Sequence, residues 1–552
     1  MPSLRLFISL LAISSLVSGC TQYASVAERR PVFHAGSTRN AEILSVEQRI
    51  AAVRKLERRD PLAAIGKYLE AAKDAAETLG RDPKNEVARQ AYNYALARVF
   101  STIRSAKIDP WTMPLVVPTS HGEITLTHRP DSRKAWNPAL YTFTPADQFD
   151  VKGSYVSKRT SKDGIGAPLV AIGKDVNTTI DENFFLPRTY YGVTAIARFA
   201  GSRCTISFED PLATETTNMD GKVFPLAGDF TVPLAVMLAS TNPKAFELSR
   251  MLRPQKYAET ARIARLQPYD PNKTVVLVIH GLMDTPATWT PMLNALRGDE
   301  RIREKYQFWF YSYPSGYPYP QSAAILRRQL DAIEKKFPLR KPMVVIGHSM
   351  GGCISRVLMT DSRDKLWMDI LGEPPEKTRL SSESKALLED MLIFRHRPEI
   401  GRVIFISAPL RGSDLAVNPL GRIGAALIQT PITLLKAGNE ALKYIKMEGD
   451  SLKLKRMPNS VDTLAPNNRF VVALNKIPLV PGIAYHTIMG DRGKGGNKDR
   501  TKPMHSDGVV PYWSSHMAGA QSELVVPSNH GAHQNAEAIA EVRRILLQHA
   551  GN

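Results

Sequence analysis

A short apolar run that ends directly in a glycine-flanked serine constrains this chain more than any other feature of its sequence. Residues 343–346 (MVVI) have the length and composition of a buried strand, and the motif GHSMG follows at once at 347–351. Residues 350–357 (MGGCISRV) then predict a helix that begins with small side chains. A tight turn of this kind between a strand and a helix raises the serine hydroxyl above the end of a sheet. The sequence therefore predicts that Ser349 is a nucleophile.

The second half of the chain alternates short apolar runs with longer helical patterns. This alternation begins near residue 265 and is typical of a parallel sheet whose strands are joined by crossover helices. The predicted strands are 275–279, 307–311, 343–346, 403–406 and 483–489, and the predicted helices are 323–336 and 536–548. Two helical insertions, at 365–398 and 414–446, interrupt the pattern. The apolar residues of the second insertion, such as Leu427 and Leu434, predict either a roof over the active site or ordinary packing on the core.

Three further segments share this region with the serine motif. The run VIHGL at 278–282 ends the first strand, ISAPLRGS at 406–413 follows a later strand, and DGVVP stands at 507–511. Together with the GHSMG motif and Trp289, these segments resemble the α/β-hydrolase family, and within it the bacterial lipases and esterases. The resemblance covers about residues 265–552 and implies an α/β fold, with a mostly parallel sheet and helices on both of its faces.

The resemblance also implies where a negatively charged oxygen is held during the reaction. Carried over by motif, the oxyanion hole consists of the backbone N–H groups of Leu282 and Met350, and Gly281 lets the backbone come close. No metal or organic cofactor is expected, because acyl transfer through a serine needs neither. Some lipases of this family hold a calcium ion with an aspartate shortly after the catalytic histidine, but residues 530–534 (HGAHQ) contain no aspartate.

A serine hydroxyl needs a general base that is itself oriented by a carboxylate, and in this fold the base comes last in chain order. Two candidates, His530 and His533, lie between a predicted last strand at 523–527 and a helix that starts near residue 536. The resembling family keeps its base in this loop. His530 is favoured because it follows the strand closely, whereas His533 would start the helix.

Two aspartates compete for the role of the acid. Asp491 follows the predicted strand 483–489 in a glycine-rich basic loop, and Asp507 stands in the DGVVP segment. Asp507 is favoured for two reasons. The stretch between Asp507 and His530 leaves room for a connection and a strand, and the DGVVP setting resembles the lipase acid loop.

The first twenty residues predict export and lipid attachment. Residues 6–17 (LFISLLAISSLV) form an apolar run that is too short to span a bilayer and is followed by small residues, as in secretory signal peptides. The ending LVSGC resembles the bacterial lipobox, which implies removal of residues 1–19 and acylation of Cys20. Because Thr21 is not an aspartate, this resemblance favours the outer membrane of a bacterial cell envelope.

Three regions separate the signal peptide from the predicted catalytic domain. Residues 20–45 are polar and predict a tether. Residues 46–109 predict a helical hairpin in which Asp60 and Asp82, each followed by proline, cap the two helix starts. Residues 110–250 predict a β-rich region that includes strands at 193–199, 204–208 and 229–232.

Charge and cysteine content exclude several classes of function. Lys and Arg outnumber Asp and Glu by 72 to 53, and the formal net charge of +19 favours anionic neighbours. Export and the lack of zinc-finger, RNA-binding or Walker-type motifs argue against nucleic acid as the partner. The three cysteines (Cys20, Cys204 and Cys353) are too few for a disulfide framework or a cysteine-rich metal site.

These observations predict a membrane-anchored serine hydrolase that cleaves carboxylic esters, lipid esters among them. Ser349, Asp507 and His530 would carry the reaction through an acyl-enzyme. Two alternatives stay open at this point: an acyltransferase with the same triad, and a non-catalytic binding or tethering lipoprotein on a hydrolase scaffold.

Overall fold

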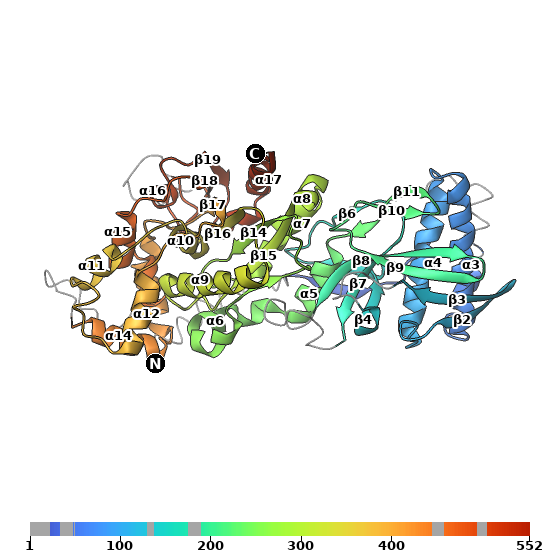
Figure 1. Cartoon of the computed structure of the whole chain (residues 1–552), viewed down its shortest axis with the longest axis horizontal. Coiled ribbons are helices and arrows are strands. Elements are labelled where there is room, and N and C mark those ends of the chain that lie inside the picture. Colours follow the sequence, from blue (N-terminus) through green and yellow to red (C-terminus); the bar gives the residue numbers. More distant parts are fainter. Residues whose placement is uncertain are drawn as a thin grey trace. The chain divides into compact units, whose positions relative to one another are not determined.

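The computed structural model describes residues 23–33, 48, 50–129, 137–174, 189–443, 458–493 and 505–551 (Figure 1). The chain divides into an N-terminal unit within Gln22–Thr241 and Asn294–Glu304, and a C-terminal unit within Asn242–Leu293 and Lys305–Asn552. The predicted signal peptide and Cys20 lie outside the described residues. Among the described helices, none is both long and apolar enough to pass through a lipid bilayer.

A seven-stranded sheet organises the C-terminal unit. Its strand order is β13-β15-β14-β16-β17-β18-β19; β13 runs antiparallel to β15, and every other pair is parallel. The strands are β13 (Arg262–Arg265), β14 (Thr274–Ile279), β15 (Tyr306–Ser312), β16 (Met343–His348), β17 (Ile400–Ile406), β18 (Ala484–Asp491) and β19 (Ser522–Pro527). The predicted α/β fold with a mostly parallel sheet is confirmed.

The central strands are apolar because the sheet is covered on both of its sides. Every residue of β14 and of β16 is buried. Strands that are buried on both faces consist of continuous apolar residues and do not alternate between apolar and polar ones. The short edge strand β13 (RIAR) was not predicted, since two of its four residues are arginines. Arg265 is nevertheless buried there, with its guanidinium carbon 4.1 Å from the centroid of the Phe337 ring.

Helices link the parallel strands and pack on them. Helix α10 lies against β14, β16 and β17, α9 lies against β13, and α17 lies against β19. From residue 242 onward the α-helices are α6 (Glu247–Leu252), α7 (Thr290–Arg297), α8 (Glu300–Lys305), α9 (Tyr319–Lys336), α10 (Met350–Val357), α11 (Lys365–Leu371), α12 (Ser382–Leu392), α13 (Pro419–Leu427), α14 (Ile432–Ala441), α15 (Arg469–Asn475), α16 (Tyr512–Ser515) and α17 (Ala536–Gly551). The first predicted insertion thus contains α11 and α12, and the second contains α13 and α14.

The N-terminal unit packs two helices on a second sheet. Helices α3 (Pro61–Arg81) and α4 (Glu86–Ser105) lie side by side, α3 against β2 and α4 against β4 and β7 (Figure 1). The sheet has the order β2-β3-β9-β8-β7-β4, and only the pair β3–β9 is parallel. Its strands are β2 (Leu115–Thr119), β3 (Gly122–His128), β4 (Tyr141–Pro145), β7 (Ala167–Gly173), β8 (Tyr190–Ala200) and β9 (Arg203–Glu209). Tyr92 of α4 and Leu126 of β3 belong to one apolar cluster, so helices and sheet share a core.

The two predicted helix caps in this unit have different outcomes. Asp60 caps α3 as predicted, because its side chain accepts the N–H of Ala63 at 3.0 Å. The prediction that Asp82 starts the next helix is wrong. Asp82 ends α3, and its Oδ1 accepts the N–H of Lys84 at 3.1 Å in a short turn. Asn85 caps α4 instead.

Two other segments differ from the sequence prediction. Of the strand predicted at 229–232, only Asp229 lies in a strand (β12, Gly228–Asp229), and α5 (Val232–Thr241) begins three residues later. The cause is the Asp229 side chain, which accepts the N–H groups of Thr231 and Val232 at 3.0 and 2.8 Å and so turns the chain into a helix. Within the predicted tether, Ser25–Glu28 form β1, which pairs with β5 (Phe149–Lys152).

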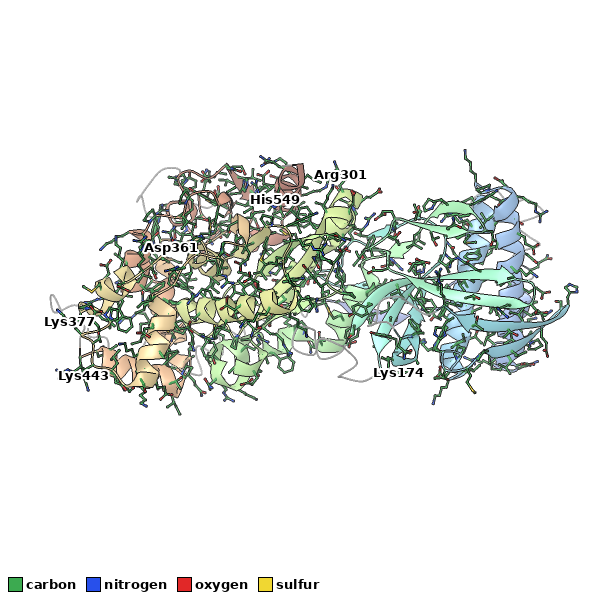
Figure 2. All side chains as sticks on the ribbon, viewed as in Figure 1. Lys174, Arg301, Asp361, Lys377, Lys443 and His549 are labelled. Carbon is green, nitrogen blue, oxygen red and sulfur yellow. The ribbon has the colours of Figure 1, made fainter. Side chains whose placement is uncertain are left out.

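Basic side chains contribute to the surfaces of both units. Lys174 in the N-terminal unit and Lys377 and Lys443 in the C-terminal unit are exposed (Figure 2). Exposed cations of this kind place the excess positive charge at the protein surface, where it can attract anionic molecules or membranes.

Candidate active site

Ser349 occupies the turn between β16 and α10 in a strained backbone conformation. Its φ and ψ are 53° and −125°, in a region that L-amino acids rarely adopt. Glycines on both sides make room for this turn. A Cβ on Gly347 would lie 2.4 Å from the Oγ of Ser355, and a Cβ on Gly351 would lie 2.3 Å from the carbonyl oxygen of Ile279. The motif therefore needs glycine at these two positions for steric reasons.

Ser349, His530 and Asp507 lie in one chain of hydrogen bonds. The Oγ of Ser349 is 2.8 Å from Nε2 of His530, and Nδ1 of the same ring is 2.8 Å from Oδ2 of Asp507. A carboxylate only accepts hydrogen bonds, so Nδ1 donates to Asp507 and Nε2 accepts from the serine hydroxyl. The Asp507 side chain is 1% exposed and that of His530 is 25% exposed. The structure thus brings together the three residues that the sequence analysis selected.

Asp507 is held in place by its own loop. Its Oδ1 accepts the backbone N–H groups of Val509 and Val510 at 2.8 and 2.7 Å, which leaves Oδ2 for His530. Burial by itself raises the pKa of Asp507, but the hydrogen bonds from His530 and from the two backbone N–H groups outweigh it, and the pKa lies below its usual value. The group is therefore ionised at neutral pH and orients the imidazole.

The turn after β14 approaches the serine closely. A Cβ on Gly281 would lie 2.9 Å from the Cβ of Ser349, so only glycine allows this approach. Leu282, the first predicted oxyanion donor, follows directly. The next residue, Met283, has a φ of 51°, and its N–H donates to the Oγ of Ser315 at 3.0 Å. This bond holds the turn beside the serine.

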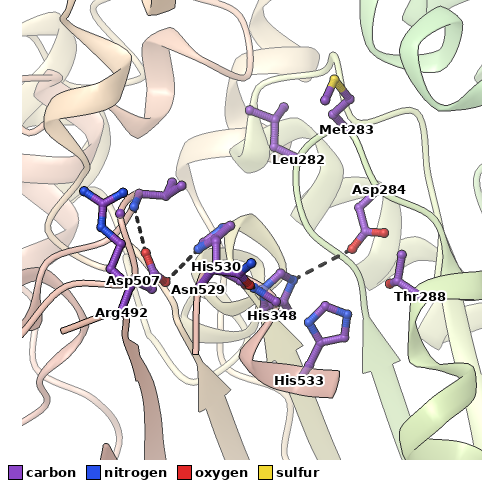
Figure 3. A pocket seen from close by; sticks show the side chains of 13 residues that line it. Leu282, Met283, Asp284, Thr288, His348, Arg492, Asp507, Asn529, His530 and His533 are labelled. Atoms are coloured by element: carbon purple, nitrogen blue, oxygen red, sulfur yellow. Dashed lines mark hydrogen bonds and ion pairs between the residues drawn. The ribbon is translucent and has the colours of Figure 1, made fainter. Parts of the chain in front are cut away.

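A cavity of about 440 Å³ opens beside the hydrogen-bond chain (Figure 3). Its walls include Leu282, Met283, Asp507, Val509 and His530. None of the lining residues comes from 365–398 or 414–446, so a roof formed by these insertions stays a prediction.

Met350, the second predicted oxyanion donor, is the first residue of α10. The first N–H groups of a helix have no acceptor within the helix, and they lie at the positive end of its dipole. This position is compatible with the role predicted for Met350, which stays a prediction.

The alternative acid and base have other partners than Ser349. Asp491 pairs with His505, whose Nδ1 is 2.7 Å from its Oδ2. His533 is 3% exposed and packs on His348, with ring centroids 4.0 Å apart. Burial lowers the pKa of His533 well below its usual value, so this imidazole is neutral.

Two residues near the site have contacts that the sequence analysis did not anticipate. Neither His348 nor Asp284 was assigned a catalytic or binding role from the sequence. Nε2 of His348 lies 2.7 Å from the carbonyl oxygen of His530, so the residue before the serine holds the loop of the histidine. Asp284 accepts the N–H of Thr285 at 2.7 Å and lies near His348 and His533. In the sequence, the feature that could have indicated Asp284 is its position three residues after the HG turn.

Comparisons with known proteins agree with this geometry. A family model described as "Alpha/beta hydrolase family" matches residues 275–542, which include every residue of the site. No curated protein matches the chain.

Many solved structures are similar to part of the chain. The mature form of lipase BlEst2 from Bacillus licheniformis is 16% identical, with a TM-score of 0.31, over 51% of this chain and 94% of that one. A putative lipase from Acinetobacter baumannii is 14% identical, with a TM-score of 0.29, over 56% and 97%. A putative aryl esterase from Burkholderia cenocepacia is 13% identical, with a TM-score of 0.24, over 51% and 93%.

The family match covers the parallel sheet, the strained serine turn and the loop that carries His530. Over residues 275–542 the chain therefore belongs to the alpha/beta hydrolase family, and it is a hydrolase.

Proposed function

We propose that this hydrolase cleaves carboxylic esters through a catalytic triad of Ser349, His530 and Asp507. The observation that carries the proposal is the continuous hydrogen-bond chain from the serine hydroxyl through the imidazole to the buried carboxylate. In such a chain the carboxylate fixes the imidazole in the tautomer that can remove the serine proton.

The proposed reaction has two halves that use the same groups. Ser349 Oγ attacks the ester carbonyl while Nε2 of His530 takes its proton, and the Asp507 carboxylate stabilises the imidazolium that forms. The backbone N–H groups of Leu282 and Met350 hold the negative oxygen of the tetrahedral intermediate. His530 then returns the proton to the departing alcohol, and water repeats the sequence on the acyl-enzyme.

Three apolar side chains in the cavity wall suit an apolar acyl group, while Asp284, Arg492 and Asn529 make other parts of the wall polar. Leu282, Met283 and Val509 line it next to His530. Met283 is 43% exposed, so apolar surface continues from the cavity to the solvent. We therefore propose esters with an apolar acyl chain, lipid esters among them, as substrates.

Labelling with a fluorophosphonate probe tests the nucleophile directly. Wild-type protein should be labelled and should hydrolyse p-nitrophenyl esters, whereas Ser349→Ala should do neither. Equal labelling of Ser349→Ala, or no labelling of a folded wild-type chain, would contradict the proposal. Hydrolysis rates over a series of acyl lengths then define the acyl preference.

An acceptor-competition assay separates the hydrolase from an acyltransferase that uses the same triad. Addition of an alcohol or an amine should leave the free acid as the main product. If most turnovers transfer the acyl group to the added acceptor, the protein is an acyltransferase.

We also propose that acyl groups on Cys20 attach the chain to a bacterial cell envelope, at the outer membrane. The LVSGC segment and Thr21 support this proposal, and several acyl chains together give stable anchoring. Cys20→Ser should abolish metabolic labelling with a fatty acid and should move the chain out of the membrane fraction. If the variant stays there but is released by high salt, the basic surface is the membrane contact; if it resists salt, the lipobox interpretation is wrong.

A further inference from the structure

Three buried side chains beside the proposed triad form a second cluster. Asp284, His348 and His533 come from the turn after β14, the end of β16 and the loop after β19 (Figure 3). One potential ligand atom of each lies within 4.8 Å of the other two. The side chains are almost fully enclosed, with exposures of 8%, 5% and 3%.

The hydrogen bonds of His348 determine which of its nitrogens is free. Its Nε2 is 2.7 Å from the carbonyl oxygen of His530, and a carbonyl only accepts, so Nε2 carries the proton. In the neutral imidazole Nδ1 then presents a lone pair. This buried atom has no hydrogen-bond partner among the described residues, and it lies 3.8 Å from Oδ2 of Asp284, too far for a hydrogen bond. This separation leaves room for a cation between a lone pair on Nδ1 and the carboxylate oxygen.

His533 provides a second nitrogen without a partner. Its Nδ1 is buried and makes no hydrogen bond within the described part of the chain. Its ring lies 4.0 Å from the ring of His348, measured between centroids. Nε2 of His533 lies 3.3 Å from Nε2 of Gln534, so binding of a metal through Nδ1 moves the ring proton to Nε2 and requires the Gln534 amide to present its oxygen there. In that arrangement the two imidazole nitrogens and one carboxylate form a set of metal ligands.

We infer that Asp284, His348 and His533 bind a divalent transition-metal ion, for which Zn²⁺ is the best match. Two imidazole nitrogens and one carboxylate oxygen leave a fourth tetrahedral position for water. The cavity beside the triad is lined by all three residues, so an ion and a water molecule can reach them. The bond from His348 to the carbonyl of His530 is the outer contact that metal-bound histidines usually make.

The ion would position His348 and the backbone of His530 and would not act on the substrate. By holding Nδ1 of His348 it keeps the proton on Nε2, and Nε2 holds the backbone of His530. No metal was expected from the sequence, because acyl transfer through a serine needs none, and the three residues lie far apart in the chain. The inference is independent of the proposed ester hydrolysis.

Metal titration of the chelator-treated full chain tests the inference without an activity assay. Co²⁺ should produce the visible absorption bands of tetrahedral coordination, and Zn²⁺ should abolish them at one equivalent per chain. Zn²⁺ should also raise the melting temperature. If the folded wild-type chain binds neither ion and shows no thermal shift, the inference is wrong.

Variants assign the ion to these ligands. His533→Gln and Asp284→Asn should weaken Zn²⁺ binding about 100-fold or more, and circular dichroism shows whether each variant is folded. His396→Gln is the matched control, because His396 also lies beside an aspartate, with Nδ1 2.8 Å from Oδ1 of Asp361, but belongs to no group of three such ligands within the described residues. Zn²⁺ binding should be unchanged in this control.

A further variant separates this inference from the proposed function. Ser349→Ala should bind Zn²⁺ like the wild type even though it cannot react with a fluorophosphonate. Wild-type affinity in a folded His533→Gln chain would overturn the inference and leave the ester hydrolase proposal untouched.

Discussion

Two carboxylate–imidazole pairs lie at the end of β18 and in the loops that follow β18 and β19, and their hydrogen bonds are almost the same. Nδ1 of His530 is 2.8 Å from Asp507, and Nδ1 of His505 is 2.7 Å from Asp491. They differ in enclosure: the side chain of Asp507 is 1% exposed, whereas that of Asp491 is 22% exposed. They differ also in the other ring nitrogen, since only Nε2 of His530 contacts a serine hydroxyl. An aspartate beside a histidine is thus a common unit, and its surroundings decide its chemistry.

The exposed pair has a structural task. Oδ1 of Asp491 accepts the backbone N–H groups of Gly493 and Ser506 at 3.0 and 3.4 Å, while Oδ2 meets His505. These bonds attach the neighbouring loop segments to the end of β18. The enclosed pair instead receives its backbone hydrogen bonds from the loop that contains Asp507 itself, which leaves Oδ2 aimed at His530.

Replacement of the two histidines should give the largest difference. His530→Ala should lower kcat by about four to six orders of magnitude, because the serine loses its base. His505→Ala should change kcat by less than about tenfold, since the ring pairs with Asp491 and, within the described part of the chain, makes no hydrogen bond to Ser349. Steady-state kinetics on one p-nitrophenyl ester provides the measurement. A large loss in His505→Ala would make the exposed pair the catalytic one.

Replacement of the two aspartates should give the next largest difference. Asp507→Asn should lower kcat by about 10³- to 10⁴-fold, because an amide can donate to Nδ1 and so favours the wrong tautomer of His530. Asp491→Asn should stay within about tenfold of the wild type. If the two variants exchange these values, Asp491 is the acid, and the assignment of Ser349 is unaffected.

The two carboxylates should also differ in how acid destabilises the chain. The pKa of Asp507 is lowered in the folded state, because its hydrogen bonds outweigh the opposing effect of burial. Its stabilising contribution is therefore present above the unfolded value of about 3.9 and is lost as the pH falls through the lower folded pKa. Urea midpoints measured from pH 6 to pH 3 should fall less steeply in Asp507→Asn than in the wild type. The pKa of Asp491 is also lowered, but this group is more exposed, so Asp491→Asn should change the slope less. Parallel curves for wild type and Asp507→Asn would contradict this expectation.

What could be predicted from sequence depended on whether the signal was local. The strand at 343–346, the serine turn and the HG turn are continuous segments, and their patterns located Ser349 and Leu282 correctly in the fold. The pairing of Asp507 with His530 followed from chain order and segment length, and the structure brings both to the serine.

Contacts that depend on folding could not be read in the same way. Asp284, His348 and His533 meet only because β14, β16 and β19 end at the same edge of the sheet. The Asp82-Pro83 pair resembles a helix start. In the structure the Asp82 side chain accepts the N–H of Lys84 in a short turn, and Asn85 caps the helix instead. Side-chain hydrogen bonds of this kind are decided by neighbours that a residue pattern does not show.

The smallest expected effect concerns the stability that the exposed pair provides at neutral pH. Asp491→Asn and His505→Gln should each lower the free energy of unfolding by at most about 1 kcal/mol, because solvent screens a pair with exposures of 22% and 40%. The double variant should cost less than the sum of the two single variants, since each of them already breaks the same contact. Urea denaturation of the four proteins at pH 7 measures this coupling. If either variant lowers the free energy of unfolding by several kcal/mol, solvent does not weaken the exposed pair. The contrast in energy between the two pairs would then rest on the serine contact alone.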